Sequence, residues 1–360
     1  MGKQKVIMLL ITYKCNLRCS YCYEPKVSNF KMSVEKAKHI IQEQIDGLDE
    51  KYETVEIQFM GGEPLLEFPL IKKCAEWLWT TPITDKKIIL FAPTNGTLLT
   101  AEMKAWFEKN KDRFNLGLSF DGDMAMQNAN RSSSFNNVDL DFFVKTWPNQ
   151  SVKMTISPDT ISKMAEGVMF LHRKGFKYIS ADLAMGNSIE WTKEKLVIYK
   201  TELKKLVEFY LANPQLIPFS MLRVAVNSIM HINAATHKTC SCGEDMVCVD
   251  WTGKAYACHL FSPVTISMEK AAKAAKTIDF KDHLCFNNGK CAKCVLNTVC
   301  THCYGMNYVC SDDINTPSPF HCSAFKLQFV ANCRYQLQIA ERNGEDDAIL
   351  RINKLINKIV

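Results

Sequence analysis

The chain has 360 residues, of which 47% are hydrophobic, and its formal net charge is +6. This length and apolar fraction allow a large core and more than one domain, and no apolar run approaches the roughly 18 residues that a membrane helix requires. The charge is spread along the chain rather than gathered in a basic tract, so no nucleic-acid partner and no membrane are expected.

Cysteine is the unusual residue of this composition, with 16 copies. The apolar run Val6–Ile11 is too short for the core of a secretory signal, so we expect a cytoplasmic protein. In a reducing compartment cysteines serve as metal ligands rather than as disulfides. The cysteine content therefore predicts metal centres.

The first predicted element is a strand at Lys5–Thr12, and three cysteines follow it directly. Cys15, Cys19 and Cys22 have the spacing C-x3-C-x2-C in the loop TYKCNLRCSYCYEP. Three thiols cannot all pair as disulfides, and they fall one ligand short of a structural zinc site. They suit a cubane iron–sulfur cluster in which one iron is left open, since such a cluster normally takes four cysteines. An open iron can bind a substrate or cosubstrate.

Short strands and amphipathic helices alternate to about residue 215. Six strand–helix units predict a parallel sheet that right-handed crossovers curl into a partial barrel. The predicted strands are Lys5–Thr12, Thr54–Met60, Lys87–Pro93, Asn115–Phe120, Ser151–Ser157 and Phe176–Leu183. The predicted helices between them include Ser33–Gly47, with Ser33 as its N-cap, and also Phe68–Trp79, Thr100–Asn110 and Thr160–Lys174.

Motifs rich in glycine and polar residues follow the next four predicted strands. They are Gly61-Gly62-Glu63-Pro64, Thr94-Asn95-Gly96-Thr97, Ser119-Phe120-Asp121-Gly122 and Ser157-Pro158-Asp159. Turn chemistry alone could account for any one of these motifs. All of them, and the cysteines, however, come at the carboxyl ends of strands, where barrel enzymes have their active sites. The two glycines allow close backbone approach to a ligand, and the carboxylate of Glu63 suits an ammonium group.

A charged helix at Trp191–Asn213, ended by Pro214 and Pro218, predicts the end of the barrel. Twelve of the sixteen cysteines lie beyond it. The stretch VCVDWTGKAYACH predicts a β-hairpin with cysteines at its two feet. Two C-terminal helices are predicted at Ser323–Asn343 and Asp347–Val360, the second packing on the body of the protein.

Two readings of the C-terminal cysteines stay open at this point. Paired C-x2-C knuckles, as in Cys291-x2-Cys294-x5-Cys300-x2-Cys303, are typical of zinc, although the five-residue gap is shorter than a zinc-ribbon loop. Eight thiolates fit two four-cysteine cubanes equally well.

The cysteine triad together with the Gly-Gly-Glu-Pro motif resembles the radical S-adenosylmethionine (radical SAM) enzymes, and the cysteine-rich second half resembles their SPASM extension. The resemblance implies an α/β fold with a partial (β/α)6 barrel at 1–220, a SPASM domain at 221–330 and C-terminal helices at 331–360. It also implies S-adenosyl-L-methionine and three [4Fe-4S] clusters, one that binds this cosubstrate and two that are auxiliary.

By this resemblance Cys15, Cys19 and Cys22 hold the barrel cluster. The implied auxiliary sets are Cys242, Cys248, Cys258 and Cys303 for one cluster and Cys291, Cys294, Cys300 and Cys322 for the other. The last knuckle gap is commonly three residues in the family and is two here, so Cys310 is a rival of Cys303. The remaining cysteines, Cys74, Cys240, Cys285 and Cys333, are interpreted as buried or spare thiols.

The resemblance also implies contacts with the cosubstrate. Gly61, Gly62, Glu63 and Pro64 would meet the methionine amino group, and the backbone at Tyr21 would meet the adenine. Asn95, Ser119, Asp121 and Arg131 would surround the ribose and carboxylate. Asn95 and Asp121 are equally explained as turn formers, and Arg131 as a surface residue.

For the reaction, the resemblance implies oxidation of a peptide or protein by a 5′-deoxyadenosyl radical. One reading is a maturase that installs a thioether or carbon–carbon cross-link in a ribosomal precursor peptide made of leader and core. The other is an anaerobic sulfatase maturase that forms formylglycine; in that group an Asp base follows the third hairpin cysteine, whereas here His259 does. The segment after Cys300 favours the cross-linking maturase, while a peptide epimerase and a zinc-stabilised binding protein are further alternatives.

The expected partners follow from this reading. A flavodoxin or ferredoxin-type protein would supply electrons. Only 14 residues precede Cys15, so we expect no N-terminal leader-binding domain. Leader recognition would then use the barrel surface, the cysteine-rich region or a separate leader-binding protein.

Overall fold

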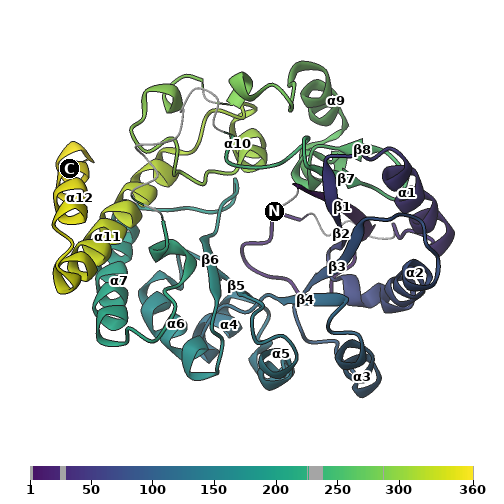
Figure 1. The fold of residues 1–360 in the computed structure, drawn as a ribbon, viewed down its shortest axis with the longest axis horizontal. Coiled ribbons are helices and arrows are strands. Elements are labelled where there is room, and N and C mark those ends of the chain that lie inside the picture. The colour runs from purple at the N-terminus through teal and green to yellow at the C-terminus, as the bar shows by residue number, and fades with distance from the viewer. Residues whose placement is uncertain (1–2, 25–29, 225, 227–237, 287, 360) are drawn as a thin grey trace. The chain divides into compact units, whose positions relative to one another are not determined.

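The computed structural model describes residues 3–24, 30–224, 226, 238–286 and 288–359 (Figure 1). These residues form two compact units that are each discontinuous in sequence. The first unit comprises Met1–Ser119, Ser134–Gln150 and Ser241–Lys281, and the second comprises Phe120–Ser133, Ser151–Cys240 and Asp282–Val360. The contiguous domain boundaries expected from the sequence remain a prediction. No helix within the described ranges has the length and apolar character needed to cross a membrane.

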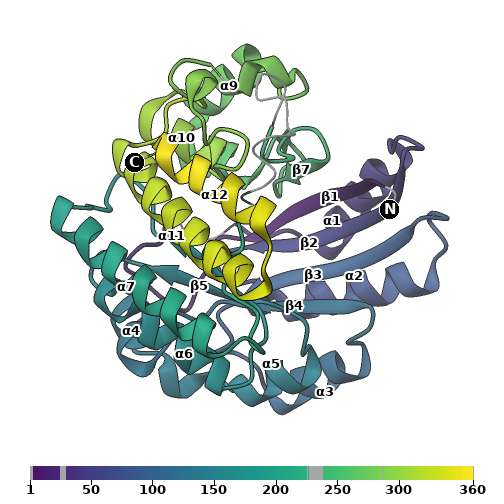
Figure 2. The same ribbon diagram turned by 60° about the vertical axis from the view of Figure 1, so that its left-hand side comes forward.

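The first unit is built on a six-stranded sheet of order β4-β3-β2-β1-β7-β8. Its strands are β1 (Lys3–Thr12), β2 (Tyr52–Gly61), β3 (Lys87–Thr94), β4 (Phe114–Leu118), β7 (Met246–Val249) and β8 (Ala255–Tyr256). The first four pair in parallel, as the alternation of strands and helices predicts, and lie side by side in Figure 2. In β2 every second side chain from Val55 to Phe59 is fully buried, which is the period expected of a strand with one covered face.

Helices lie beside the strands of this unit (Figure 1). They are α1 (Val34–Asp46), α2 (Phe68–Thr80), α3 (Ala101–Lys109) and α5 (Leu140–Thr146), with α8 (Pro263–Ile266) and α9 (Met268–Thr277) beside the hairpin segment. The predicted N-cap of α1 is confirmed, because the Ser33 hydroxyl accepts a hydrogen bond from the backbone N–H of Lys36. The buried face of α1 includes Ile40 and Ile41, as its apolar spacing predicts.

The predicted hairpin is present as β7 and β8, with Cys248 opposite Tyr256 in antiparallel register. Its turn is closed by Asp250, whose Oδ1 accepts from the backbone N–H groups of Thr252 and Lys254. An additional pairing, which the sequence does not predict, joins β7 in parallel to β1 and places Cys248 opposite Met8. The hairpin therefore continues the sheet of the first unit.

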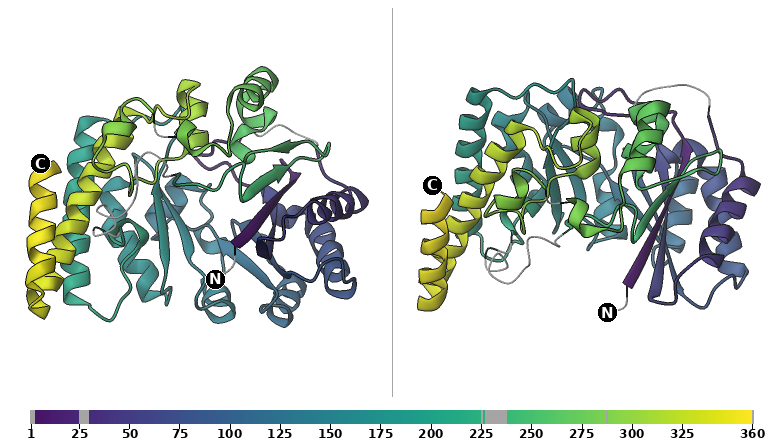
Figure 3. Two further views of the ribbon diagram at one scale, coloured as in Figure 1. Left: turned by 45° about the horizontal axis from the view of Figure 1, so that its top comes forward. Right: turned by 90° about the horizontal axis from the view of Figure 1, so that it is seen from above.

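The second unit contains a parallel two-stranded sheet of β5 (Val152–Ile156) and β6 (Ile179–Leu183). Its helices are α4 (Met124–Asn130), α6 (Met164–Arg173), α7 (Lys193–Ala212), α10 (Tyr304–Ser311), α11 (Pro319–Asn343) and α12 (Asp346–Ile359). The C-terminal helices α11 and α12, yellow in both views of Figure 3, run side by side and share a core that includes Phe329 and Leu355. This packing confirms the predicted role of the last helix; Val360, the predicted end of that helix, lies outside the described residues.

Candidate functional site

The loop after β1 presents the three cysteines of the triad. Cys15 and Cys19 are partly exposed and Cys22 is exposed, while the side chain of Leu17 between them is buried. The loop is tightly wound, because the backbone N–H of Cys22 donates to the carbonyl of Cys19 over 3.2 Å, and that of Leu17 donates to Cys15 Sγ over 3.4 Å. Three accessible thiols on an anchored loop fit a cluster that is held by three protein ligands.

The glycine pair at the end of β2 is required by the triad loop itself. The backbone N–H of Gly62 donates to the carbonyl of Thr12 and that of Glu63 to the carbonyl of Lys14, over 3.1 and 2.8 Å. A Cβ atom on Gly61 would collide with the carbonyl oxygen of Thr12, and one on Gly62 with that of Lys14. Gly61 also has a φ of +146°, which side-chain-bearing residues rarely adopt. The backbone of the triad loop thus occupies the Cβ positions of both glycines, and their contact with the methionine amino group of the cosubstrate stays a prediction.

Glu63 is buried, with 1% of its surface exposed, and its carboxylate joins two loops. Oε1 accepts from the backbone N–H of Leu65 over 3.0 Å and from the hydroxyl of Thr94 over 2.9 Å. Oε2 accepts from the backbone N–H of Asn95 over 2.7 Å. These charge-assisted contacts hold the ends of β2 and β3 together at the predicted site.

Asn16 extends this network to the triad and was not identified from the sequence. Its side-chain carbonyl accepts from the Asn95 amide over 2.9 Å, and its own amide donates to the hydroxyl of Thr97 over 2.8 Å. The only sequence signal was its position next to Cys15. Through Asn95 and Asn16, Glu63 is thus linked to the loop that carries the cysteines.

The other predicted cosubstrate contacts of the first unit lie in the same region. The backbone N–H of Ser119 donates to the carbonyl of Thr94 over 2.9 Å, so the ends of β3 and β4 are joined. Tyr21 is partly exposed between the second and third triad cysteines, and Pro64 is buried. The structure thus gathers Tyr21, the Gly61–Pro64 motif, Asn95 and Ser119 at the carboxyl ends of neighbouring strands.

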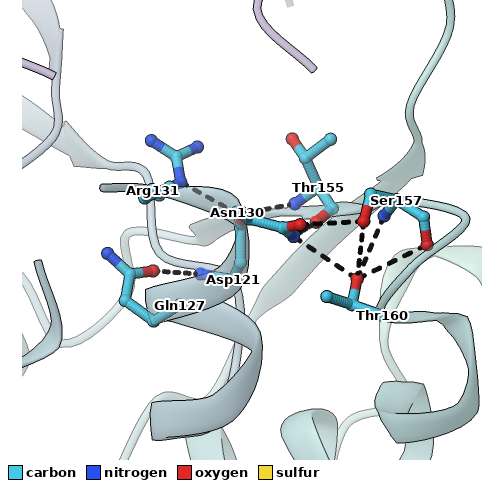
Figure 4. Close-up of polar contacts among 7 residues, drawn as sticks. All are labelled: Asp121, Gln127, Asn130, Arg131, Thr155, Ser157 and Thr160. Atoms are coloured by element: carbon cyan, nitrogen blue, oxygen red, sulfur yellow. Dashed lines mark hydrogen bonds and ion pairs between the residues drawn. The ribbon is translucent and has the colours of Figure 1, made fainter. Parts of the chain in front are cut away.

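Asp121 and Arg131 belong to the second unit and form an ion pair there (Figure 4). Arg131 Nε lies 3.1 Å from Asp121 Oδ1, and both side chains are buried. Asp121 also accepts from the backbone N–H of Thr155 and from the Asn130 amide, over 2.9 and 3.1 Å. Asn130 continues the network to Ser157, whose hydroxyl donates to it over 2.8 Å. Asp121 therefore orients Arg131, and Figure 4 shows the terminal nitrogens of Arg131 directed away from the carboxylate.

Tyr23 and His259 form a contact within the first unit that no sequence pattern predicts. The Tyr23 hydroxyl lies 2.9 Å from His259 Nε2, and the two rings are 5.7 Å apart. Tyr23 follows Cys22, and His259 follows Cys258. Burial lowers the pKa of His259 to about 4, so the ring is neutral at physiological pH.

The hairpin packs against the triad loop through aromatic side chains as well. Phe30 stacks on Trp251 at 4.4 Å between ring centroids, and Tyr13 meets the same indole edge-on at 5.3 Å. Glu24 is inserted beside them, and burial raises the pKa of its carboxyl to about 7. No sequence pattern identified Glu24, because its burial depends on segments more than 200 residues apart.

The hairpin cysteines Cys242, Cys248 and Cys258 are buried in the first unit. Burial raises the pKa of Cys248, and the neighbouring Cys258 adds to this effect. Their proposed fourth partner, Cys303, lies in the second unit at the start of α10, where its sulfur accepts from the backbone N–H of Met306 over 3.4 Å. The rival Cys310 is exposed.

Cys240, interpreted as a spare thiol, lies near Cys303 in the second unit. Burial raises the pKa of Cys303, and Cys240 is close enough to contribute to the shift. The segment is held by Thr239, whose backbone N–H and hydroxyl both contact the Tyr304 hydroxyl at 3.2 Å. The choice between Cys303 and Cys310 remains a prediction.

The second set of predicted auxiliary ligands surrounds one cavity of about 730 Å³ in the second unit. The four cysteines that line it are Cys291, Cys294, Cys300 and Cys322. Burial raises the pKa of Cys300 to about 12, and that of Cys291 is raised by burial and by Cys322 and Cys294. In the parts of the chain that the structure describes, no three His, Cys, Asp or Glu side chains lie close enough for a single metal ion. Four thiols lining one cavity match the number of cysteine ligands that a cubane cluster takes.

Part of the chain resembles known proteins in sequence. Residues 9–138 match the model of the Radical SAM superfamily. An uncharacterised protein of Methanocaldococcus jannaschii is 35% identical over 119 residues, 33% of this chain and 39% of that protein. A cysteine-type anaerobic sulfatase-maturating enzyme of Clostridium perfringens is 25% identical over 177 residues, 46% of this chain and 47% of the enzyme. The alignments thus span less than half the length of these curated relatives.

Solved structures resemble the chain over more of its length. The structure of anSMEcpe with bound AdoMet and the Cp18Cys peptide has a TM-score of 0.73 at 19% identity, covering 94% of this chain and 99% of that one. Streptococcus suis SuiB bound to the precursor peptide SuiA has a TM-score of 0.54 at 15% identity, covering 89% and 76%. The predicted fold class, an α/β partial barrel followed by a cysteine-rich region, is confirmed by these matches.

Proposed function

We propose that this chain, a radical SAM protein by its residues 9–138, matures a peptide or protein substrate and installs an oxidative thioether or carbon–carbon cross-link in a ribosomal peptide. The observation that carries the proposal is the triad loop, which places three thiols after the carboxyl end of β1. Backbone hydrogen bonds from Gly62 and Glu63 hold this loop. SuiB, with its precursor peptide, and anSMEcpe, with its peptide, have the same fold.

The residues proposed to hold the barrel cluster are Cys15, Cys19 and Cys22. When bound, this cluster and S-adenosyl-L-methionine supply the radical that abstracts a hydrogen atom from the substrate. The chain itself fixes the site: the glycine pair lets the triad loop lie directly against the end of β2, and Glu63 ties that end to β3. We propose that the carboxylate of Glu63 binds the methionine ammonium group of the cosubstrate.

The remaining cosubstrate contacts are proposed from the family resemblance together with their placement. Tyr21, Pro64, Asn95 and Ser119 lie with Glu63 at the strand ends of the first unit. Arg131 suits the cosubstrate carboxylate, because a guanidinium is always charged and Asp121 fixes its orientation through Nε. The auxiliary sets, one on Cys242, Cys248, Cys258 and Cys303 and one around the 730 Å³ cavity, are proposed to hold two further clusters.

His259 is the proposed base of the reaction. Forming a thioether from an S–H and a C–H group removes two hydrogens, one as an atom and the other as a proton and an electron. A neutral imidazole can accept this proton, and the contact with Tyr23 at 2.9 Å orients the ring. A flavodoxin or ferredoxin-type protein in the cytoplasm is proposed to supply the electron that starts the reaction. The auxiliary clusters, when bound, would accept the electron released as the new bond forms.

The anaerobic sulfatase maturase is the second candidate function, favoured by the 25% identity with the Clostridium perfringens enzyme and the fold match to anSMEcpe. Against it, His259 stands where that group has a carboxylate base. A peptide epimerase and a zinc-stabilised binding protein are weaker alternatives. A brown protein with broad visible absorption after anaerobic reconstitution would exclude the zinc alternative.

Tandem mass spectrometry of candidate peptides incubated with enzyme, cosubstrate and reductant separates these functions. A cross-link lowers the mass by two hydrogens, about 2 Da, and prevents fragmentation between the joined residues. Formylglycine from serine loses the same mass but forms a hydrazone with a hydrazine, which would overturn the cross-link. An unchanged mass in ordinary water, together with the uptake of one deuterium when the reaction is run in deuterated water, would indicate an epimerase. Peptides offered with and without their leader would show whether a separate leader-binding protein is needed.

A further inference from the structure

Among the polar side chains that line the cavity of Cys291, Cys294, Cys300 and Cys322, two are buried and have no role in the proposed function. They are Asn297 and His302, which are 2% and 3% exposed. Among the described residues, neither the amide atoms of Asn297 nor the two ring nitrogens of His302 have a hydrogen-bond partner. Both residues are therefore buried beside four thiols with their polar atoms unsatisfied.

Such burial is costly. A buried donor without a partner costs about 1–3 kcal/mol, and native proteins contain few of them. An imidazole carries at least one N–H donor in either of its protonation states, and a carboxamide carries two. The unsatisfied N–H groups of His302 and Asn297 thus call for an acceptor inside the cavity. The sulfur atoms of an iron–sulfur cluster and its cysteine ligands are acceptors of this kind.

The position of His302 is fixed with respect to the cysteines. Its backbone N–H makes a hydrogen bond with Cys300, and its ring meets that of Tyr304 edge-on at 4.9 Å between centroids. His321 Nε2 lies 3.6 Å from the sulfur of Cys300, within reach of an N–H···S hydrogen bond. One cysteine of the set is therefore approached by two histidines.

We propose that His302 and Asn297 donate hydrogen bonds to the sulfur atoms of an auxiliary cluster in this cavity, as His321 does to Cys300, and thereby raise the reduction potential of that cluster. This inference rests on the proposed function, since it requires the cluster. Hydrogen bonds to sulfur stabilise the reduced cluster, which carries the additional negative charge. The three side chains are positioning residues, and they make this cluster the better acceptor of the electron from the substrate.

The test measures midpoint potentials rather than turnover. The background is the full chain with Cys15→Ala, Cys19→Ala and Cys22→Ala, which removes the barrel cluster from the spectra. The protein is reconstituted anaerobically, and the reduced clusters are followed by electron paramagnetic resonance during a redox titration. A Cys291→Ala variant identifies which signal comes from the cavity. The test variants are His302→Phe and Asn297→Leu, which are close in shape to the native side chains and lack the donors.

We expect each variant to keep its iron and sulfide content while the potential of the cavity cluster becomes more negative. His302→Gln, which retains a donor, should restore part of the shift. The control is His39→Phe, at an exposed histidine of α1 in the first unit, and should leave both potentials unchanged. The signal of the other auxiliary cluster serves as an internal reference in every sample.

Unchanged potentials in His302→Phe and Asn297→Leu at full iron content would overturn the proposal. Loss of the cluster in both His302→Phe and His302→Gln would also overturn it, because His302 would then be an iron ligand. If Cys291→Ala and Cys322→Ala lose no iron, the auxiliary cluster itself is absent, and the proposed function fails at that point instead.

Discussion

The hydroxyl of Tyr23 lies 2.9 Å from Nε2 of His259, although 236 positions separate the two residues in the chain. Each directly follows a cysteine that is proposed to bind a cluster, Cys22 in one case and Cys258 in the other. The contact therefore joins the loop of the barrel cluster to the foot of the hairpin within one compact unit.

If His259 accepts the substrate proton, His259→Phe should reduce the yield of modified peptide by about 100-fold or more, the usual contribution of a general base. Tyr23→Phe removes only the orienting hydrogen bond and should reduce it by roughly two- to tenfold. Product and 5′-deoxyadenosine are both quantified by liquid chromatography and mass spectrometry. Cosubstrate cleavage should persist in both variants. Unaltered product formation in His259→Phe would show that His259 is not the base.

Cys19→Ala should abolish formation of 5′-deoxyadenosine, because the barrel cluster loses one of its three protein ligands. The auxiliary clusters should survive, so about two thirds of the iron of the native protein should remain. Iron analysis and cosubstrate cleavage are measured on the same preparation, with Cys74→Ala at a buried cysteine of α2 as the control. Complete loss of iron, or undiminished cleavage, would contradict the assignment of the triad.

Gly62→Ala should displace the triad loop, since the added methyl group meets the carbonyls of Lys14 and Tyr13. Backbone on both sides leaves little freedom to relax, so we expect loss of the barrel cluster and of about one third of the iron. Gly47→Ala is the matched control: its Cβ would meet only the Glu43 carbonyl at 3.5 Å, an ordinary contact distance. Equal iron contents in the two variants would show that the loop tolerates the methyl group.

If Glu63 faces the methionine ammonium as proposed, Glu63→Gln should weaken binding of S-adenosyl-L-methionine on the order of tenfold or more, because the negative charge is lost. The amide would also present N–H groups to Leu65, Thr94 or Asn95, which donate to the carboxylate. Thr94→Val removes one of these donors but keeps the charge. Comparable dissociation constants for Glu63→Gln and Thr94→Val, measured by isothermal titration calorimetry, would indicate that Glu63 acts only by joining the loops.

His172 predicts a pH dependence of stability in the second unit. Its ring nitrogens contact the Phe176 carbonyl and the Tyr210 hydroxyl at 3.0 and 2.9 Å, and burial lowers its pKa below the usual 6.5. The unfolded chain then binds more protons as the pH falls through 6.5, so the contribution of neutral His172 to stability is present above that pH and is lost below it. The urea midpoint should fall from pH 7.5 to 5.5 by more in the native protein than in His172→Gln. Equal falls would contradict the assignment.

Several features of this protein follow from the sequence because they depend on interactions between neighbouring residues. The alternation of apolar side chains predicts β1 to β6 to within a few residues, and the N-cap at Ser33 follows from its position before an apolar stripe. The triad and the hairpin are equally local, since spacing and turn chemistry determine them.

Only the tertiary structure decided which distant groups share an environment. The parallel pairing of β7 with β1, the contact of Tyr23 with His259 and the contact of His321 with Cys300 all join segments whose approach no local pattern encodes. Hydrogen-bond satisfaction and pKa depend on the solvent and charges around a group, and these exist only once remote segments have packed. For the same reason Asp121, read from the sequence as a turn former or a ligand contact, became the buried partner of Arg131 in the folded chain.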